Sequence, residues 1–172
     1  MLKSIRKAVQ EGIRFLTGWS YMIVPSRSMD PTILPGDIII SEDKFQYYVE
    51  GAVDGVYARG DVVTFWDEED PYNYMVKRIV AVAGDTVTAK HKKLYVNGTP
   101  LEEPYLKEPL VYLLPNIEVG AGEVFVLGDN RNNSDDCHFT CRGIKLSRVV
   151  GRVEGVWKTR GLLGWIFGRE SS

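Results

Sequence analysis

Histidine and cysteine are scarce in this chain, with two of each among 172 residues. A structural zinc site needs about four His or Cys ligands. Only His138 stands near the pair Cys137 and Cys141, so we predict neither a metal site nor a cofactor. The two cysteines leave two states open, a local disulfide in an oxidising compartment or two free thiols.

Positive charge is not in excess either. The chain carries 21 Lys and Arg against 23 Asp and Glu, which gives a net charge of −2. Phosphate binding needs a concentrated basic surface. The composition therefore argues against nucleic acid as a partner. The length suits one domain with short appendages.

Long apolar runs are absent as well. No stretch of about 18 uncharged apolar residues occurs, so no conventional membrane-spanning helix is predicted. Residues 2–19 instead repeat with helical period and separate apolar from basic side chains. A basic amphipathic helix of this kind suits the surface of an anionic membrane, and docking of its apolar face on the domain is the alternative. The apolar face carries Leu2, Ile5, Val9, Ile13 and Leu16, and the polar face Lys3, Arg6, Lys7, Gln10 and Arg14.

The rest of the sequence indicates a β domain. Short β-branched and aromatic runs alternate with Gly, Pro, Asp and Asn, which is typical of strands and turns. We predict a mainly β fold in which antiparallel sheets form a partly closed barrel or sandwich. The predicted strands are 37–41, 61–66, 74–83, 86–90, 93–96, 123–127 and 148–157.

Three segments make up the predicted organisation. The amphipathic helix covers 1–20, the β domain covers 21–159, and an apolar tail covers 160–172. The tail is expected to form either a second contact with the membrane interface or a segment packed on the domain.

Two serines stand one residue apart, at Ser26 and Ser28. In extended backbone, residues i and i+2 point to the same side. One hydroxyl is thus placed to attack a carbonyl while the other donates to the oxygen that becomes charged. A serine needs an activating base for this chemistry.

Lys77 is the candidate base. The run 74–82 is apolar on both alternating faces except at Lys77 and Arg78, which point to opposite sides of a strand. A lysine among apolar neighbours has a lowered pKa and can act as a general base, whereas arginine stays protonated. One alternative is a Lys77 head group that reaches solvent at a strand edge. Another is a Ser-His-Asp triad, which would have to use His138, because His91 lies in a charged turn.

A third polar segment, 128–136, follows an apolar strand. Asn, Asp and Ser side chains bond nearby backbone and make compact loops. We predict a rigid loop that presents Ser134 and Asp136 toward a site. An ordinary surface loop is the alternative, and a calcium loop is disfavoured because the carboxylates lack the EF-hand order.

Together these segments resemble the bacterial-type signal peptidase I family, whose members are membrane-associated serine–lysine endopeptidases that remove signal peptides from exported proteins. Four boxes occur in the family's order and span most of the β domain. They are PSRSMDPT at 25–32 with Gly-Asp at 36–37, RGDVVTF at 59–65, VKRIV at 76–80 with Gly-Asp at 84–85, and GDNRNNSDD at 128–136.

The resemblance implies a role for each matched residue. Ser28 is the expected nucleophile and Lys77 the general base. Ser26 then supplies the side-chain donor of an oxyanion hole, beside the Ser28 backbone N–H. Ser134 resembles the family serine that orients the lysine amine, and Asp136 resembles the acidic residue that supports its loop. Acylation of Ser28 is expected first, followed by hydrolysis with water activated at Lys77.

The same resemblance implies the substrates and the location. Signal-peptide-bearing preproteins are expected to bind in extended form, with small residues one and three positions before the cut, as in Ala-x-Ala. Met29 and Met75 are the expected lining of the shallow pockets. A membrane lipid surface is the second expected partner, with peripheral or monotopic attachment and the catalytic domain on the exported face.

The sequence departs from the family pattern at several points. Histidine at 138 stands where many relatives have arginine, and Arg27 replaces a small residue between the two serines. An amphipathic helix stands where relatives have membrane spans. Two other functions are alternatives: a self-cleaving repressor-type Ser/Lys protease, disfavoured because only about 25 residues precede Ser28, and a non-catalytic membrane-surface module.

Overall fold

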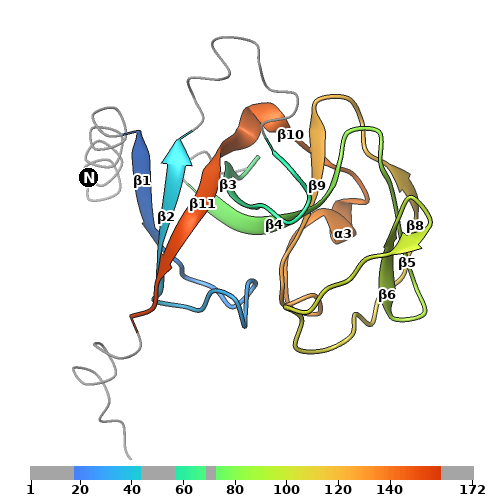
Figure 1. The fold of residues 1–172 in the computed structure, drawn as a ribbon, viewed down its shortest axis with the longest axis horizontal. Coiled ribbons are helices and arrows are strands. Elements are labelled where there is room, and N and C mark those ends of the chain that lie inside the picture. Colours follow the sequence, from blue (N-terminus) through green and yellow to red (C-terminus); the bar gives the residue numbers. More distant parts are fainter. Residues whose placement is uncertain (1–17, 44–56, 69–72, 160–172) are drawn as a thin grey trace, which may run out of the picture.

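The computed structural model describes residues 18–43, 57–68 and 73–159. In these residues eleven strands form two antiparallel sheets (Figure 1). The larger sheet has the order β1-β2-β11-β3-β4-β9-β10, and the smaller has the order β7-β6-β5-β8. The larger sheet contains β1 Trp19–Ile23, β2 Ile38–Asp43, β3 Val62–Trp66, β4 Tyr74–Val82, β9 Glu123–Leu127, β10 Ile144–Lys145 and β11 Val149–Trp157. The smaller contains β5 Thr86–Lys90, β6 Lys93–Val96, β7 Thr99–Pro100 and β8 Leu114–Glu118, and two short helices are α3 Cys137–Thr140 and η1 Leu146–Arg148.

The predicted mainly β fold with antiparallel sheets is confirmed. Strands β5, β6 and β9 begin and end at the predicted residues, and the other predicted strands agree within two residues at either end. Asn97 and Gly98 have φ values of 53° and 76°, the left-handed backbone that a tight hairpin turn requires. Strands β1, β7, β8 and β10 and helix α3 were not predicted.

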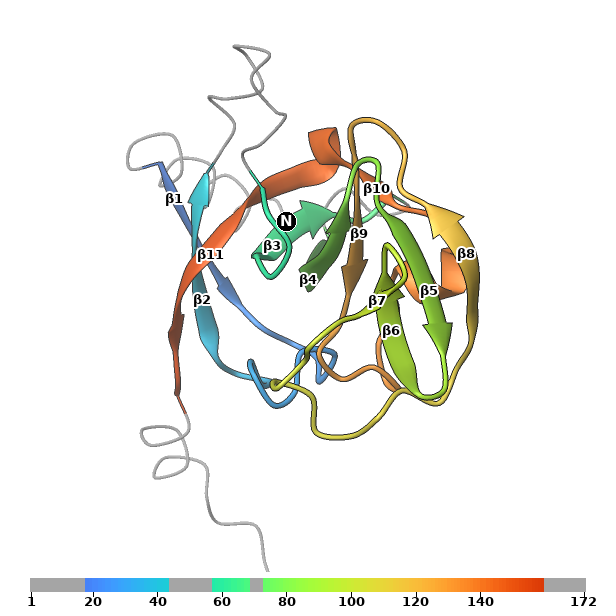
Figure 2. The same ribbon diagram turned by 45° about the vertical axis from the view of Figure 1, so that its right-hand side comes forward.

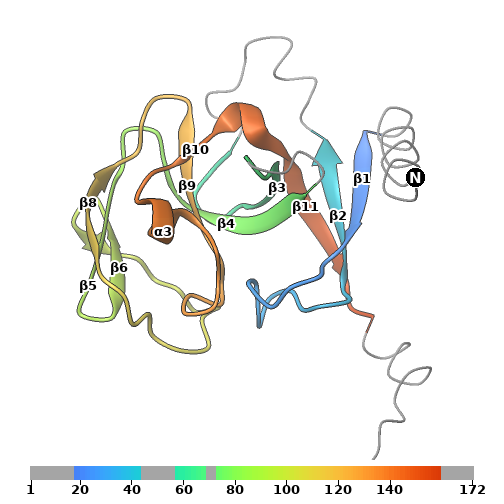
Figure 3. The same ribbon diagram turned by 180° about the vertical axis from the view of Figure 1, so that it is seen from behind.

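The two sheets share one large hydrophobic core. Figure 2 shows the larger sheet curling from β1 round to β10, and Figure 3 shows α3 from behind, beside β9. Phe65 and Phe125 of the larger sheet are fully buried in this core together with Val87 and Leu94 of the smaller one. A second, smaller core cluster consists of Val24, Met29, Ile33, Ile39 and Val76.

Several predictions concern residues outside the described ranges. Residues 2–17 of the expected amphipathic helix and the tail at 160–172 lie there. Trp19 and Ser20, however, belong to β1, so a helix cannot extend to residue 20. Among the described residues, no helix has both the length and the apolarity needed to cross a membrane.

Candidate active site

Ser28 lies in the segment that joins β1 to β2. The Val24 N–H donates to the Asp37 carbonyl at 2.9 Å and closes this segment into a compact loop. Met29, the residue that follows the serine, is fully buried in the second core cluster and anchors the loop there. From a distant part of the chain, the Asn130 N–H donates to the Ser28 carbonyl at 2.9 Å. Ser28 is therefore held both by its own loop and by the loop after β9.

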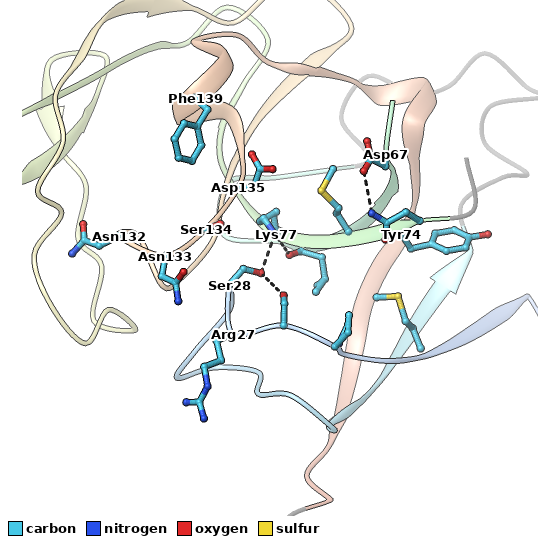
Figure 4. A pocket seen from close by; sticks show the side chains of 16 residues that line it. Arg27, Ser28, Asp67, Tyr74, Lys77, Asn132, Asn133, Ser134, Asp135 and Phe139 are labelled. Atoms are coloured by element: carbon cyan, nitrogen blue, oxygen red, sulfur yellow. Dashed lines mark hydrogen bonds between the residues drawn. The ribbon is translucent and has the colours of Figure 1, made fainter. Parts of the chain in front are cut away.

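Lys77 lies in the middle of β4 and reaches Ser28. Its side chain is buried, and Nζ donates to Ser28 Oγ at 3.0 Å and to the Val76 carbonyl at 3.2 Å (Figure 4). Arg78 points to the opposite face, where its guanidinium donates to both carboxylate oxygens of Asp129 at 2.9 and 2.7 Å. The predicted burial of Lys77 is confirmed, and the alternative of a solvent-exposed head group is wrong.

The surroundings of the Lys77 amine favour its neutral form. Burial lowers the pKa of Lys77 below its ordinary value of 10.5, and the carboxylates of Asp136 and Asp135 oppose this shift. Desolvation disfavours an ammonium ion because water is lost from around the charge. A neutral amine 3.0 Å from a hydroxyl can accept that hydroxyl's proton. The pair thus has the geometry of a serine nucleophile and a lysine base.

Two hydrogen-bond donors lie beside Ser28 Oγ. The Ser26 hydroxyl is 3.2 Å from it. The Ser28 backbone N–H has no acceptor among the described residues. Preorganised donors of this kind stabilise negative charge that develops on a carbonyl oxygen. The arrangement fits the oxyanion hole expected from the sequence.

Ser134 and Asp136 lie together in the loop after β9. Asp136 Oδ2 accepts from Ser134 Oγ at 2.5 Å and from the Gly128 N–H at 2.8 Å. Ser134 lines the same cavity as Lys77, but no hydrogen bond joins its hydroxyl to the lysine amine in the described part of the chain. The Ser134 hydroxyl donates its hydrogen bond to the Asp136 carboxylate instead, because an ionised acceptor makes the stronger bond.

Gly128, at the start of this loop, has no room for a side chain. A Cβ there would overlap Ser134 Oγ and the Ser28 carbonyl oxygen. Both groups belong to segments that the sequence separates by about 100 residues. The absent side chain lets the end of β9, the Ser28 loop and the Ser134 loop meet at one point.

The dyad opens into a cavity of about 940 Å³. One end is lined by Met22 of β1 and by Met75 and Val76 of β4, with Asp67 also at this end, and the other is lined by Asn132, Asn133 and Phe139. Figure 4 shows Tyr74 at the first end and Arg27, Asn132 and Asn133 at the second, with Lys77 between them. Met75 therefore lies where the sequence placed it. Met29 does not, because its side chain is buried in the second core cluster beneath the loop.

Comparison with known proteins decides the family. A family model described as signal peptidase, peptidase S26, matches residues 11–158. The chain belongs to this signal peptidase family. It is 38% identical over 122 residues to a probable signal peptidase I-1 of Synechocystis sp., covering 67% of this chain and 59% of that one. It is 33% identical over 145 residues to a signal peptidase I of Bacillus licheniformis, covering 78% and 74%.

Two further relatives extend the comparison. The chain is 36% identical over 139 residues to thylakoidal processing peptidase 1, chloroplastic, of Arabidopsis thaliana, covering 75% of this chain and 39% of that one. The crystal structure of a signal peptidase I from Enterococcus faecalis V583 is 29% identical, with a TM-score of 0.50, and the match covers 56% of this chain and 96% of that one. The match thus spans less than two thirds of the length of the Synechocystis and Arabidopsis relatives.

Neither histidine is placed to form a triad with Ser28. His138 Nδ1 lies 2.7 Å from Asp136 Oδ1, and its ring stacks on Tyr112 at 4.3 Å between centroids. The ionisable side chain that contacts Ser28 Oγ is Lys77. Cys137 and Cys141 are both free thiols, and the described residues contain no cluster that could hold a metal ion.

A buried ion pair supports the site and was missed by the sequence analysis. Arg131 is almost fully buried and donates to Glu103 Oε2 at 3.0 Å and Oε1 at 2.5 Å. Its Nε donates to the Gly128 carbonyl at 3.1 Å, so the pair holds the start of the Ser134 loop. Arg131 lies within a recognised box, but nothing in the sequence pointed to Glu103, 28 residues away, as its partner.

Proposed function

We propose that this protein is a serine endopeptidase that removes signal peptides from exported preproteins with a Ser28–Lys77 dyad. The observation that carries the proposal is the 3.0 Å hydrogen bond between the buried Lys77 amine and Ser28 Oγ. Membership of the signal peptidase family supports it. The preserved contact also argues against a non-catalytic module, since a module without activity has no need to keep a lysine buried.

The proposed reaction begins with acylation. Neutral Lys77 takes the proton of Ser28 Oγ as that oxygen attacks the scissile carbonyl carbon. The Ser26 hydroxyl and the Ser28 N–H donate to the oxyanion that forms. The intermediate collapses, the C–N bond breaks, and the Lys77 ammonium returns the proton to the departing amine.

Deacylation uses the same base. Lys77, neutral again, takes a proton from a water molecule whose oxygen attacks the acyl carbon, and the ester bond to Ser28 breaks as Oγ regains the proton. The bond from Ser134 to Asp136 keeps the polar loop fixed beside the amine throughout both steps. Positioning of this kind depends on neighbours that lock each side chain.

The cavity supports a division of the substrate between its two ends. Signal peptides carry small apolar residues before the cut, which suit the end lined by Met22 and Met75. The mature sequence after the cut then extends over the other end, past Asn133. Bulky side chains before the cut would meet the walls formed by β1 and β4.

The test is cleavage of a purified preprotein in detergent, read as the new N-terminus by mass spectrometry. We expect cleavage after an Ala-x-Ala sequence and a fall of at least about tenfold in kcat/KM when Phe replaces the Ala before the cut. Ser28→Ala serves as the blank and Ser147→Ala, in an exposed position, as the matched control. Cleavage that persists in Ser28→Ala would refute the proposal.

A lipid surface is the second proposed partner. Trp19, Tyr21 and Ile23 are exposed on one face of β1. Ile23 pairs with Ile38, which pairs with Trp157, and cross-strand partners share a face of the sheet. This face, consisting of these exposed residues of β1 and Trp157 of β11, combines aromatic and aliphatic side chains as membrane-interface contacts do.

Liposome flotation tests the membrane contact. We expect Trp157→Ser and Ile23→Ser each to weaken binding to anionic vesicles about tenfold, because each removes a large apolar side chain from the contact. Val111→Ser, equally exposed but outside this face, is the control. If both face variants float as wild type does, this face of the sheet does not contact the membrane.

A further inference from the structure

A basic turn closes the hairpin between β5 and β6. Residues 90–93 read Lys-His-Lys-Lys, and all four are exposed. Lys90 and Lys93 are direct cross-strand partners, and like charges placed opposite each other destabilise a sheet. The lysines that form ion pairs in the described part of the chain are Lys107 and Lys158, so no carboxylate there compensates the charge of this turn.

The backbone of the same turn is strained as well. His91 and Lys92 have φ values of 51° and 61°, in the left-handed region that residues with a Cβ rarely adopt. The next hairpin of the sheet, between β6 and β7, has Asn97 and Gly98 in this conformation, which suits them. The β5–β6 turn thus keeps basic side chains at two positions where Asn-Gly is the more stable choice. Strained positions of this kind are found where side chains serve a function.

Exposed aliphatic side chains lie between this turn and the active-site cavity. Val111 and Leu113, in the segment that enters β8, are 75% and 77% exposed. Leu114 is the cross-strand partner of Ala89, so Leu113 adjoins the end of β5 at the basic turn. On the other side, the Val111 N–H donates to Asn132 Oδ1 at 2.9 Å, and Asn132 lines the cavity. A surface therefore leads from the cavity over the two aliphatic residues to the lysines.

This surface lies on the side of the cavity where, in the proposed function, the preprotein continues after the cut. Figure 4 shows Asn132 and Asn133 at the end of the cavity away from Tyr74. Figure 3 shows the smaller sheet at the opposite end of the molecule from β1. A bilayer that contacts the exposed face of β1 is therefore not placed to reach the β5–β6 turn. A polypeptide that leaves the cavity past Asn132 is placed to do so.

We propose that Val111, Leu113 and the three lysines of the β5–β6 turn form an exit surface that binds the mature segment of the preprotein, the part that follows the cut. The chemistry of the surface favours mature segments in which acidic residues accompany apolar ones. Their carboxylates pair with the lysines and relieve the repulsion between Lys90 and Lys93, and their apolar side chains cover Val111 and Leu113. Binding away from the scissile bond lowers KM and leaves the chemical step unchanged.

Charge reversal on both partners tests this inference, which rests on the proposed function. Two preproteins are compared that carry either Glu or Lys spread through the early mature segment. We expect wild type to cleave the Glu form with a kcat/KM about three- to tenfold higher, through KM, and this preference to shrink as salt screens the charges. Lys93→Glu should abolish the preference. Lys145→Glu makes the same reversal at an exposed position of β10 in the larger sheet and should retain it.

Three outcomes are decisive. An equal preference for the Glu form in wild type and Lys93→Glu would overturn the inference. Flotation on anionic vesicles that is lost in Lys93→Glu while the substrate preference persists would also overturn it, because the turn would then bind lipid. A short peptide that ends soon after the cut does not reach the exit surface, so failure of wild type to cleave this peptide would instead count against the proposed function.

A second readout does not depend on cleavage. A fluorescent peptide with the Glu-bearing mature segment is titrated, by anisotropy, against wild type and against the double variant His91→Asn, Lys92→Gly. We expect this variant to melt about 2–4 °C higher, because its turn residues adopt positive φ without strain. It should also bind the peptide about threefold more weakly, because it lacks one lysine of the turn. A higher melting temperature with unchanged binding would overturn the inference, whereas absent cleavage leaves this comparison intact.

Discussion

Lys77→Met is expected to reduce preprotein cleavage by about 10⁴-fold or more, as removal of a nucleophile's base does in serine proteases. Methionine fills much of the same buried volume but offers no nitrogen to Ser28 Oγ, which Nζ contacts at 3.0 Å. The donors at Ser26 and the Ser28 N–H are left in place. The measurement is single-turnover cleavage at pH 8. Cleavage that survives this change but fails in His138→Ala would transfer the role of base to the histidine.

The same variant is expected to gain stability at neutral pH. Burial lowers the folded-state pKa of Lys77 below its ordinary value of 10.5. Between these two pKa values the unfolded chain binds more protons than the folded one, so wild-type stability falls as the pH falls through this window. The penalty is about 1.4 kcal/mol for each unit of depression, and methionine does not incur it.

Urea unfolding across this pH window measures the effect. The stability difference between Lys77→Met and wild type should be largest near pH 7 and should shrink as the pH rises toward 10.5. Lys93→Met, in an exposed position of β6, is the control and should give a difference that does not change with pH. A flat difference for Lys77→Met as well would mean that the lysine is charged in the folded protein.

Glu103→Gln is expected to lower the free energy of unfolding by about 3–5 kcal/mol, because it leaves the buried Arg131 guanidinium without a counter-charge. The Arg131 side chain is fully buried and that of Glu103 is 7% exposed, so water cannot compensate. Loss of the pair should also loosen the Gly128 carbonyl, to which Arg131 donates at 3.1 Å. Cleavage activity should therefore fall together with stability.

A double variant and a surface pair make this result specific. Glu103→Leu combined with Arg131→Met should recover most of the lost stability, since apolar residues of similar volume replace a buried ion pair well. Glu154→Gln, which breaks the part-exposed pair with Arg152, should cost at most about 1 kcal/mol. If Glu103→Gln were as mild as Glu154→Gln, the buried pair would not stabilise the loop.

The alternation of apolar and polar residues along the sequence predicted those strands that have one buried face or a buried apolar run. Strand β4 was predicted from its apolar run, and the two residues that interrupt this run, Lys77 and Arg78, pointed to Lys77 as the candidate base. Strand β1 was missed because Trp19, Tyr21 and Ile23 are exposed, so the usual alternation of apolar inside and polar outside is absent. Its apolar residues then appeared to continue a helical pattern.

Other features depend on contacts that no local pattern carries. Strand β8 includes Pro115, which normally argues against a strand and is tolerated here because β8 is an edge strand of the smaller sheet. Met29 adjoins the nucleophile in sequence, yet the turn directs it into the core rather than into the cavity. The Glu103–Arg131 pair joins two loops, and only the packed structure brings them together.

The end of β9, the Ser28 loop and the Ser134 loop meet at Gly128, and this has a consequence for the nascent chain during its synthesis. The nucleophile, its base and the supporting carboxylate come from residues 28, 77 and 136, and β4, which carries the base, pairs with β9. A nascent or partly unfolded chain therefore exposes Ser28 without a desolvated amine beside it. In the proposed mechanism such a chain lacks its base, and we expect it to cleave no peptide bond until β9 has paired with β4.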